Sequence, residues 1–180
     1  MAALRFSVLL ALTDAGLAQN ELTLTNGDFS DLTGLQEMAG GWYAGVPAGW
    51  VAADSGDGST NYAIRQEAGD FVANVSALSR TQPSFAALTQ EVGRLPATGE
   101  VTLTFELKEP WHSPEFYLGA AVYDSMSMAY PLASGDFTSA GTHTLTASNV
   151  PAGTPIRVGF WSVKGFPGLD NVQIAVRPKE

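Results

Sequence analysis

The sequence predicts an all-β fold, a sandwich or barrel of antiparallel strands. Apolar and polar residues alternate along several segments of modest length, which is the period of half-buried strands. Turn-forming residues separate these segments, and the 180-residue chain contains 19 Gly and 10 Pro. No stretch combines a helical period with capping residues. Short strands at such spacing indicate two packed sheets or a closed barrel.

The clearest predicted strand runs from Glu100 to Glu109. Threonine and charged residues occupy one face, and the face that we expect in the core carries Val101, Leu103, Phe105 and Leu107. Segments 142–147, 156–163 and 172–176 alternate in the same way. In segment 156–163, Phe160 is expected in the core, so Trp161 has the opposite parity and faces the other side of its sheet.

Weaker strand patterns and turn signals fill the rest of the chain. The weaker strands are 62–67, 71–77, 84–92 and 116–123. Turn residues occur at 26–27, 46–49, 54–59, 95–96, 133–136 and 151–153, and the EVGR sequence around Glu91 is also interpreted as a turn. No internal repeat or low-complexity linker divides the chain, so we expect one β-sandwich domain over residues 22–180.

Residues 1–21 allow two interpretations. Arg5, the apolar run 6–12 and the small residues behind it follow the pattern of an export signal. Alternatively, the segment is an arm that anchors the domain in a larger assembly, because it alternates like a strand at Phe6, Val8 and Leu10. The apolar run is too short to cross a bilayer, so we expect no membrane span.

The composition excludes several classes of function. The net charge is −9 and no basic patch is present, so binding to a phosphate backbone is not expected. The chain has no cysteine, which excludes a disulfide, a thiolate metal site and a cysteine nucleophile. Apolar residues make up 45% of the chain, which is too many for an intrinsically disordered protein.

Catalytic motifs are missing from the sequence. There is no G-x-S-x-G nucleophile elbow, no H-E-x-x-H metal motif and no phosphate-binding G-x-x-x-x-G-K. The two histidines are His112, in a loop-like segment, and His143, in a threonine-rich strand. A glycosidase needs two facing carboxylates. Glu109, Glu115 and Asp124 are available for such a pair, but no motif accompanies them. The interpretation we favour is that the protein is not an enzyme.

Three short motifs occur in a characteristic order. NGDF stands at 26–29, PAGW at 47–50 and LDNV at 169–172. This set resembles the galactose-binding-like β-sandwich, in particular its carbohydrate-binding modules, and the resemblance covers residues 22–176. It implies a jelly-roll sandwich in which the first and last strands lie side by side, and it implies a core position for Trp50.

The same resemblance implies one structural calcium ion. Asp28 and Asp170 would lie at the same end of the sandwich, where many members of the family bind calcium through carbonyl and carboxylate oxygens. Asp170 matches the closing acid of the family. Ser30 stands where the family usually has a glutamate, so Asp28 or Asp31 would replace it, or the site is empty. In the alternative interpretation, Asn26 and Asp28 only make the hydrogen bonds of a turn.

Aromatic residues are the candidates for sugar binding. Sugars present apolar C–H faces edged by hydroxyl groups, so their sites combine flat rings with a few polar side chains. The predicted carbohydrate-binding residues are Trp111, His112, Tyr117, Tyr123, Trp42 and Tyr43. For each of them, the alternative is a partly buried ring that covers a loop.

We therefore expect a non-catalytic carbohydrate-binding β-sandwich outside the cell, with a surface polysaccharide or glycan as its partner. One setting is a secreted protein, in which residues 1–21 are a signal. The other is a spike, fibre or decoration protein of a phage-like particle. In that setting residues 1–21 bind other particle subunits, and sugar binding is secondary or absent.

Overall fold

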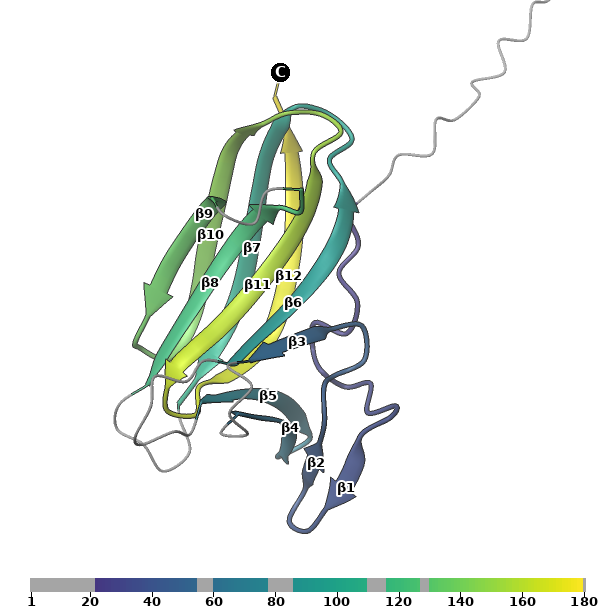
Figure 1. Ribbon diagram of the computed structural model, residues 1–180, viewed down its shortest axis with the longest axis vertical. Helices are drawn as coiled ribbons and strands as arrows, with labels where there is room; N and C mark the ends of the chain where they lie inside the picture. Colours follow the sequence, from purple (N-terminus) through teal and green to yellow (C-terminus); the bar gives the residue numbers. More distant parts are fainter. Residues whose placement is uncertain (1–21, 55–59, 78–85, 110–115, 127–129, 180) are drawn as a thin grey trace, which may run out of the picture.

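The computed structural model describes residues 22–54, 60–77, 86–109, 116–126 and 130–179. These residues form two antiparallel sheets and contain no helix, which confirms the predicted all-β sandwich. The two sheets lie over each other in Figure 1, with β6, β11, β8 and β9 over β12, β7 and β10. Within the described ranges there is accordingly no helix that could cross a membrane.

The seven-stranded sheet has the order β1-β2-β4-β5-β12-β7-β10. Its strands are β1 (Gln36–Met38), β2 (Trp42–Ala44), β4 (Thr60–Glu67), β5 (Asp70–Ala77), β12 (Gly168–Pro178), β7 (Gly99–Lys108) and β10 (Gly141–Val150). The five-stranded sheet has the order β3-β6-β11-β8-β9. It contains β3 (Val51–Asp54), β6 (Ala86–Arg94), β11 (Pro155–Lys164), β8 (Tyr117–Asp124) and β9 (Pro131–Phe137).

Strand alternation builds the core between the sheets. The predicted inward face of β7 is buried, and Phe105 has no exposed surface. Its ring packs edge-on against Phe160 of β11 and Phe137 of β9, with 5.1 Å between ring centroids in each pair. Trp50 lies 5.6 Å from Phe29 and 6.0 Å from Phe160. These rings join strands of both sheets, because aromatic side chains bury the most apolar area per residue.

The N-terminal turn is attached to the last strand. The carbonyl of Gly27 accepts a hydrogen bond from the Val172 N–H at 2.8 Å, and the Trp50 indole donates to the carbonyl of Asn26 at 3.2 Å. A Cβ atom at position 27 would lie 2.2 Å from the Val172 oxygen, so only glycine permits this approach. The residues of NGDF, PAGW and LDNV therefore meet at one place.

Two predicted turns are strands instead. Residues 133–136 belong to β9, where Gly135 leaves room for two core side chains: a Cβ there would lie 3.1 Å from Phe137 and 3.3 Å from Leu145. The EVGR sequence continues β6 to its end at Arg94. The register against β11 shifts beside Glu91, which is a β-bulge with Gly93 at a φ of 117°. Gly135 thus marks a packing contact in β9, and Gly93 marks a bulge in β6.

The other turn predictions have mixed outcomes. Turns at 26–28, 48–49 and 152–153 are confirmed. Residues 55–59, which make up most of the predicted turn at 54–59, lie outside the described residues, as do residues 1–21.

Replacing Phe105 by alanine is expected to lower the free energy of unfolding by about 3–5 kcal/mol, because it leaves a cavity between the two sheets. Urea denaturation measures the loss. Thr104→Ala is the matched control, since Thr104 lies on the outer face of the same strand, and it should cost less than about 1 kcal/mol. Equal losses for the two variants would contradict the assigned faces of β7.

Candidate functional site

The side of the five-stranded sheet that faces away from the core carries three large aromatic residues. In β8, Leu118, Ala120 and Val122 are buried in the core, so Tyr117 and Tyr123 face outward and are half-buried. In β11, Phe160 is buried and the half-buried Trp161 faces outward, as its parity predicts. We call the outward side of this sheet, with Tyr117, Tyr123 and Trp161, the aromatic face.

Two glycines support the rings of the aromatic face. The strand register places Trp161 opposite Gly119, and Gly159 lies two pairs further along the same two strands, opposite Ala121. A Cβ atom at Gly119 would lie 2.0 Å from the Trp161 indole, and one at Gly159 would lie 3.1 Å from the Tyr123 ring. The Trp161 indole therefore lies directly over backbone, where only glycine leaves space for it, and the Tyr123 ring makes a close contact at Gly159.

A pocket of about 270 Å³ lies on this face. It is lined by Ala53, Ala87, Thr89, Tyr123, Gly159, Phe160 and Trp161. Its lining combines small residues with the rings of Tyr123 and Trp161. A hollow lined by aromatic rings suits a flat ligand that has an apolar face.

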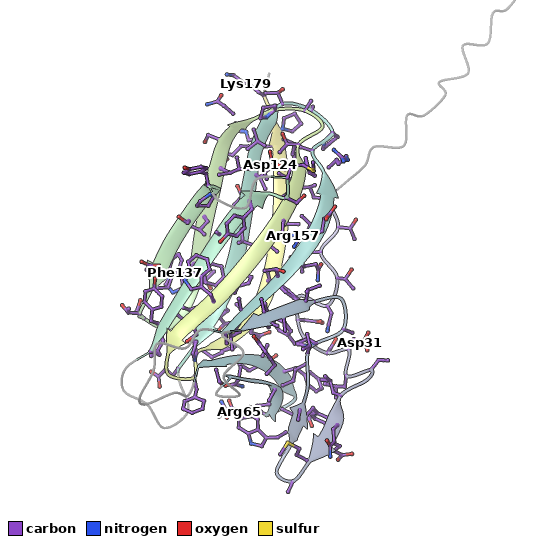
Figure 2. The ribbon with its side chains drawn as sticks, in the orientation of Figure 1. Asp31, Arg65, Asp124, Phe137, Arg157 and Lys179 are labelled. Atoms are coloured by element: carbon purple, nitrogen blue, oxygen red, sulfur yellow. The ribbon has the colours of Figure 1, made fainter. Side chains whose placement is uncertain are left out.

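Polar groups surround the rings. The Tyr117 hydroxyl donates a hydrogen bond to Asp136 of β9, and Arg157 forms a 3.4 Å ion pair with Glu91 of β6. Arg157, labelled in Figure 2, lies near the start of β11. Burial raises the pKa of both Tyr117 and Tyr123, so both phenols are neutral donors at neutral pH. Tyr123 can donate a hydrogen bond to a ligand, and Tyr117, whose proton is donated to Asp136, can accept one, which suits a ligand that is rich in hydroxyl groups.

The predicted sugar-binding residues do not form one cluster. Tyr117 and Tyr123 share the aromatic face, whereas Trp42 and Tyr43 lie in β2 of the other sheet. Trp42 faces away from the core with the Arg65 guanidinium 5.6 Å from its ring, and Tyr43 packs against the core. Trp111 and His112 lie outside the described residues.

Trp161 was not among the predicted sugar-binding residues. Its parity opposite to Phe160 was the available signal in the sequence. What the sequence could not give is the pairing of Trp161 with Gly119, which depends on register between strands about 40 positions apart in the chain.

The two acids of the predicted calcium site have separate surroundings. Asp28 is exposed and accepts hydrogen bonds from the backbone N–H and hydroxyl of Ser30. Asp170 has no exposed surface; its carboxylate accepts the Asn171 N–H at 2.6 Å and lies 3.3 Å from Lys108 Nζ. In the part of the chain that is described, no group of three or more His, Cys, Asp and Glu is arranged to hold a metal ion.

Lys108 joins three carboxylates on the outer side of the seven-stranded sheet. Its ammonium lies 2.9 Å from Glu106 and 3.3 Å from both Asp70 and Asp170. Burial raises the pKa of Asp170 from its ordinary value of 3.8 to about 6, against the lowering effects of the Asn171 hydrogen bond and of Lys108. The lysine thus provides a counter-ion that a buried aspartate needs.

Comparison with known proteins adds information on the fold. No protein-family model and no curated protein sequence matches the chain. Among solved structures, the chain is similar to the carbohydrate-binding module TmCBM61, solved with β-1,4-galactotriose, at 15% identity and a TM-score of 0.54. That match covers 87% of this chain and 99% of the module. A CBM4 module matches at 13% identity and a TM-score of 0.52, over 86% of this chain and 100% of the module.

The third similar structure belongs to a larger protein. It is the enzymatically active domain of tailspike protein 4 of bacteriophage CBA120, at 13% identity and a TM-score of 0.57. The match covers 86% of this chain but only 21% of the tailspike chain. The architecture of this chain is therefore the β-sandwich found in carbohydrate-binding modules, and it also occurs as one part of a tailspike protein.

The shared calcium site stays a prediction. An ion held by Asp28 and Asp170 would bind only the folded state, so adding calcium to chelator-treated protein should raise the melting temperature. Asp28→Ala should remove that rise, and thermal melts of both proteins measure it. If calcium leaves both melting curves unchanged, Asp28 acts only in its turn and Lys108 is the counter-ion of Asp170.

The buried carboxyl of Asp170 predicts a pH dependence of stability. Its folded pKa lies above the ordinary value, so between about pH 4 and 6 the folded state holds a proton that the unfolded state has released. Lowering the pH from 7 to 4.5 should therefore stabilise the wild type relative to Asp170→Asn, by up to about 1.4 kcal/mol per pH unit. Urea unfolding of both proteins at several pH values tests this. Parallel pH profiles would contradict the assigned pKa.

Proposed function

We propose that this protein is a non-catalytic carbohydrate-binding module that holds an extracellular polysaccharide on its aromatic face. The proposal rests on one observation: the rings of Trp161 and Tyr123 lie over Gly119 and Gly159. Rings that are fixed over backbone form a flat apolar floor, and the C–H face of a sugar ring stacks on such a floor. Tyr117 and Thr89 stand beside it as partners for sugar hydroxyl groups.

The dimensions of the face favour a chain of sugars over a single one. Tyr117 and Tyr123 are six positions apart along β8, which corresponds to about 20 Å of strand. Trp161 lies on the neighbouring strand, between these two positions. A ligand that contacts all three rings must therefore extend over several sugar units along the strands.

The acids of the aromatic face do not support glycoside hydrolysis. Two catalytic carboxyl groups lie about 5–9.5 Å apart. Glu91 of β6 and Asp136 of β9 are separated by three strand steps, which is about 14 Å before their offset along the strands is counted. Each is also bound, Glu91 to Arg157 and Asp136 to Tyr117. His143 is no substitute, because its ring packs against Phe105 and Phe137.

The charge of the protein supports a ligand without strong negative charge. The chain carries −9 overall, and Arg157 on the aromatic face is paired with Glu91. Stacking and neutral hydrogen bonds then supply the affinity, so binding is expected to tolerate salt.

The setting of the protein is also a proposal. Either residues 1–21 direct export, or they attach the sandwich to a phage-like particle as a spike or fibre component. The similarity to part of a phage tailspike supports the second setting at the level of fold. In that setting sugar binding on the aromatic face would bring the particle to a cell surface.

An array of cell-surface and plant polysaccharides tests the proposed function. Trp161→Ala should weaken binding at least tenfold, a loss of about 1.4 kcal/mol or more, while the protein stays folded. Gly119→Ala should act in the same direction, because its methyl group displaces the indole. Thr104→Ala, which changes the outer face of the other sheet away from both pockets, is the control and should bind as the wild type does.

Two results would overturn the proposal. One is the absence of binding to every polysaccharide by the wild type, which would favour a structural particle component. The other is binding that survives both Trp161→Ala and Gly119→Ala.

A further inference from the structure

A second pocket, of about 280 Å³, lies on the seven-stranded sheet. It is lined by Met38, Trp42, Ala44, Ala63, Asn74, Ser76 and Phe166. We propose that this pocket binds one neutral sugar ring that carries an apolar substituent, a methyl or an acetyl group, independently of the aromatic face.

The pocket opens away from the core. Along β4 and β5, Tyr62, Ile64, Ala73 and Val75 belong to the core between the sheets. Their neighbours Ala63, Asn74 and Ser76 therefore face the other side of the sheet. The aromatic face belongs to the five-stranded sheet, so among the described lining residues the two pockets have none in common, and they share no strand.

Two polar side chains lie at the base of this otherwise apolar pocket. Asn74 is only 4% exposed and Ser76 only 3%, although both lie on the outward side of β5. Burial of an amide or a hydroxyl is unfavourable unless it makes hydrogen bonds. The Asn74 amide reaches the Val72 carbonyl at a long 3.4 Å. If this side of β5 served only packing, apolar residues such as Val72 would suffice there.

The burial of Asn74 also argues against its N-glycosylation. Asn74 begins an Asn-Val-Ser triplet, the acceptor sequence for N-glycosylation. A glycan needs an exposed asparagine, and the folded chain buries this one in β5. The amide is thus positioned to contact a ligand in the pocket instead.

The walls of the pocket are held in place. The Arg65 guanidinium lies 5.6 Å from the Trp42 ring and forms a 2.6 Å ion pair with Glu67. In Figure 2, Arg65 is labelled at the lower end of the molecule, beside β4 and β5. A cation over the ring fixes its orientation. Phe166 comes from the connection between β11 and β12, which approaches β5 closely because Gly168 has no side chain to meet Val72.

The lining defines the class of ligand. Trp42 and Phe166 suit the C–H face of a sugar ring, and Met38, Ala44 and Ala63 surround it with apolar surface. None of the described lining residues is charged, so a neutral ligand is expected. An unsubstituted hexose would leave hydroxyl groups facing apolar walls without partners, whereas a methyl or acetyl group would fill that space. The volume of about 280 Å³ lies just below the usual range of small-molecule pockets, about 300–1,000 Å³, so it suits one ring.

Matched pairs of sugars test this assignment. D-fucose differs from D-galactose only by lacking the 6-hydroxyl group, and N-acetylglucosamine differs from glucose only at C2. We expect saturation-transfer NMR to detect D-fucose, N-acetylglucosamine or both at millimolar concentration, with at least fivefold weaker binding of the corresponding parent sugar. Trp42→Ala and Ala63→Leu should abolish this binding, the first by removing a wall and the second by filling the pocket.

Trp161→Ala is the control that separates this pocket from the aromatic face. It should leave the binding of the small sugars unchanged, and Ala63→Leu should leave any polysaccharide binding unchanged. A thermal melt of each variant shows that it is folded. The inference fails if neither substituted sugar binds, if the parent sugars bind equally well, or if binding survives Ala63→Leu. Loss of small-sugar binding in Trp161→Ala would assign that binding to the aromatic face and would equally overturn it.

Discussion

The contact between Phe105 of β7 and Phe160 of β11 determines much of this structure. The two rings meet at 5.1 Å between the sheets, and Phe137 and Trp50 pack around them. Because side chains alternate along a strand, the inward position of Phe160 places Trp161 on the outer surface. A slip of one residue in β11 would exchange the two rings and would expose the core. The same constraint therefore stabilises the sandwich and presents the aromatic face.

Alternation places Trp161 and Tyr123 on the outer surface of the five-stranded sheet, and two glycines of that sheet hold the rings in position. An outward tryptophan on a flat sheet is free to rotate, whereas one lying over Gly119 has backbone beneath it. The Tyr123 ring lies close to Gly159, where a Cβ atom would be 3.1 Å from it. A ring that is already fixed loses little conformational entropy when a ligand stacks on it, so less of the interaction energy is lost on binding. Glycine usually weakens a strand interior, and here the weakening is offset by ring packing.

The sequence predicted those features that depend on local alternation. The β-sandwich, the inward face of β7 and the outward Trp161 all follow from period-two patterns within single strands. Strands β1, β2 and β3 were not predicted, because three or four residues are too few to show a period. The strand at 133–136 was missed because Gly135 signals a turn in isolation and a packing contact only beside Phe137 and Leu145.

For the candidate sites too, the sequence predicted local features but not those that depend on the pairing of distant strands. Composition identified Tyr117, Tyr123 and Trp42 as candidates, but it placed them in one cluster. Pairing between distant strands separates them, because β8 and β2 belong to different sheets. Tyr43 follows Trp42 directly in β2, and alternation alone implies that these two neighbours cannot contact the same ligand.

The arrangement of the two proposed sites has a consequence for how the protein would contact a surface. The aromatic face extends along its strands and lies on the five-stranded sheet, whereas the small pocket lies on the seven-stranded sheet and faces away from the core. One extended polysaccharide cannot lie along the aromatic face and also enter the pocket without passing around the edge of the sandwich. Occupation of both sites would therefore join two separate glycans. Such bridging raises the effective concentration of the second site once the first is bound, so modest affinities at each site would suffice to hold the protein on a dense glycan layer.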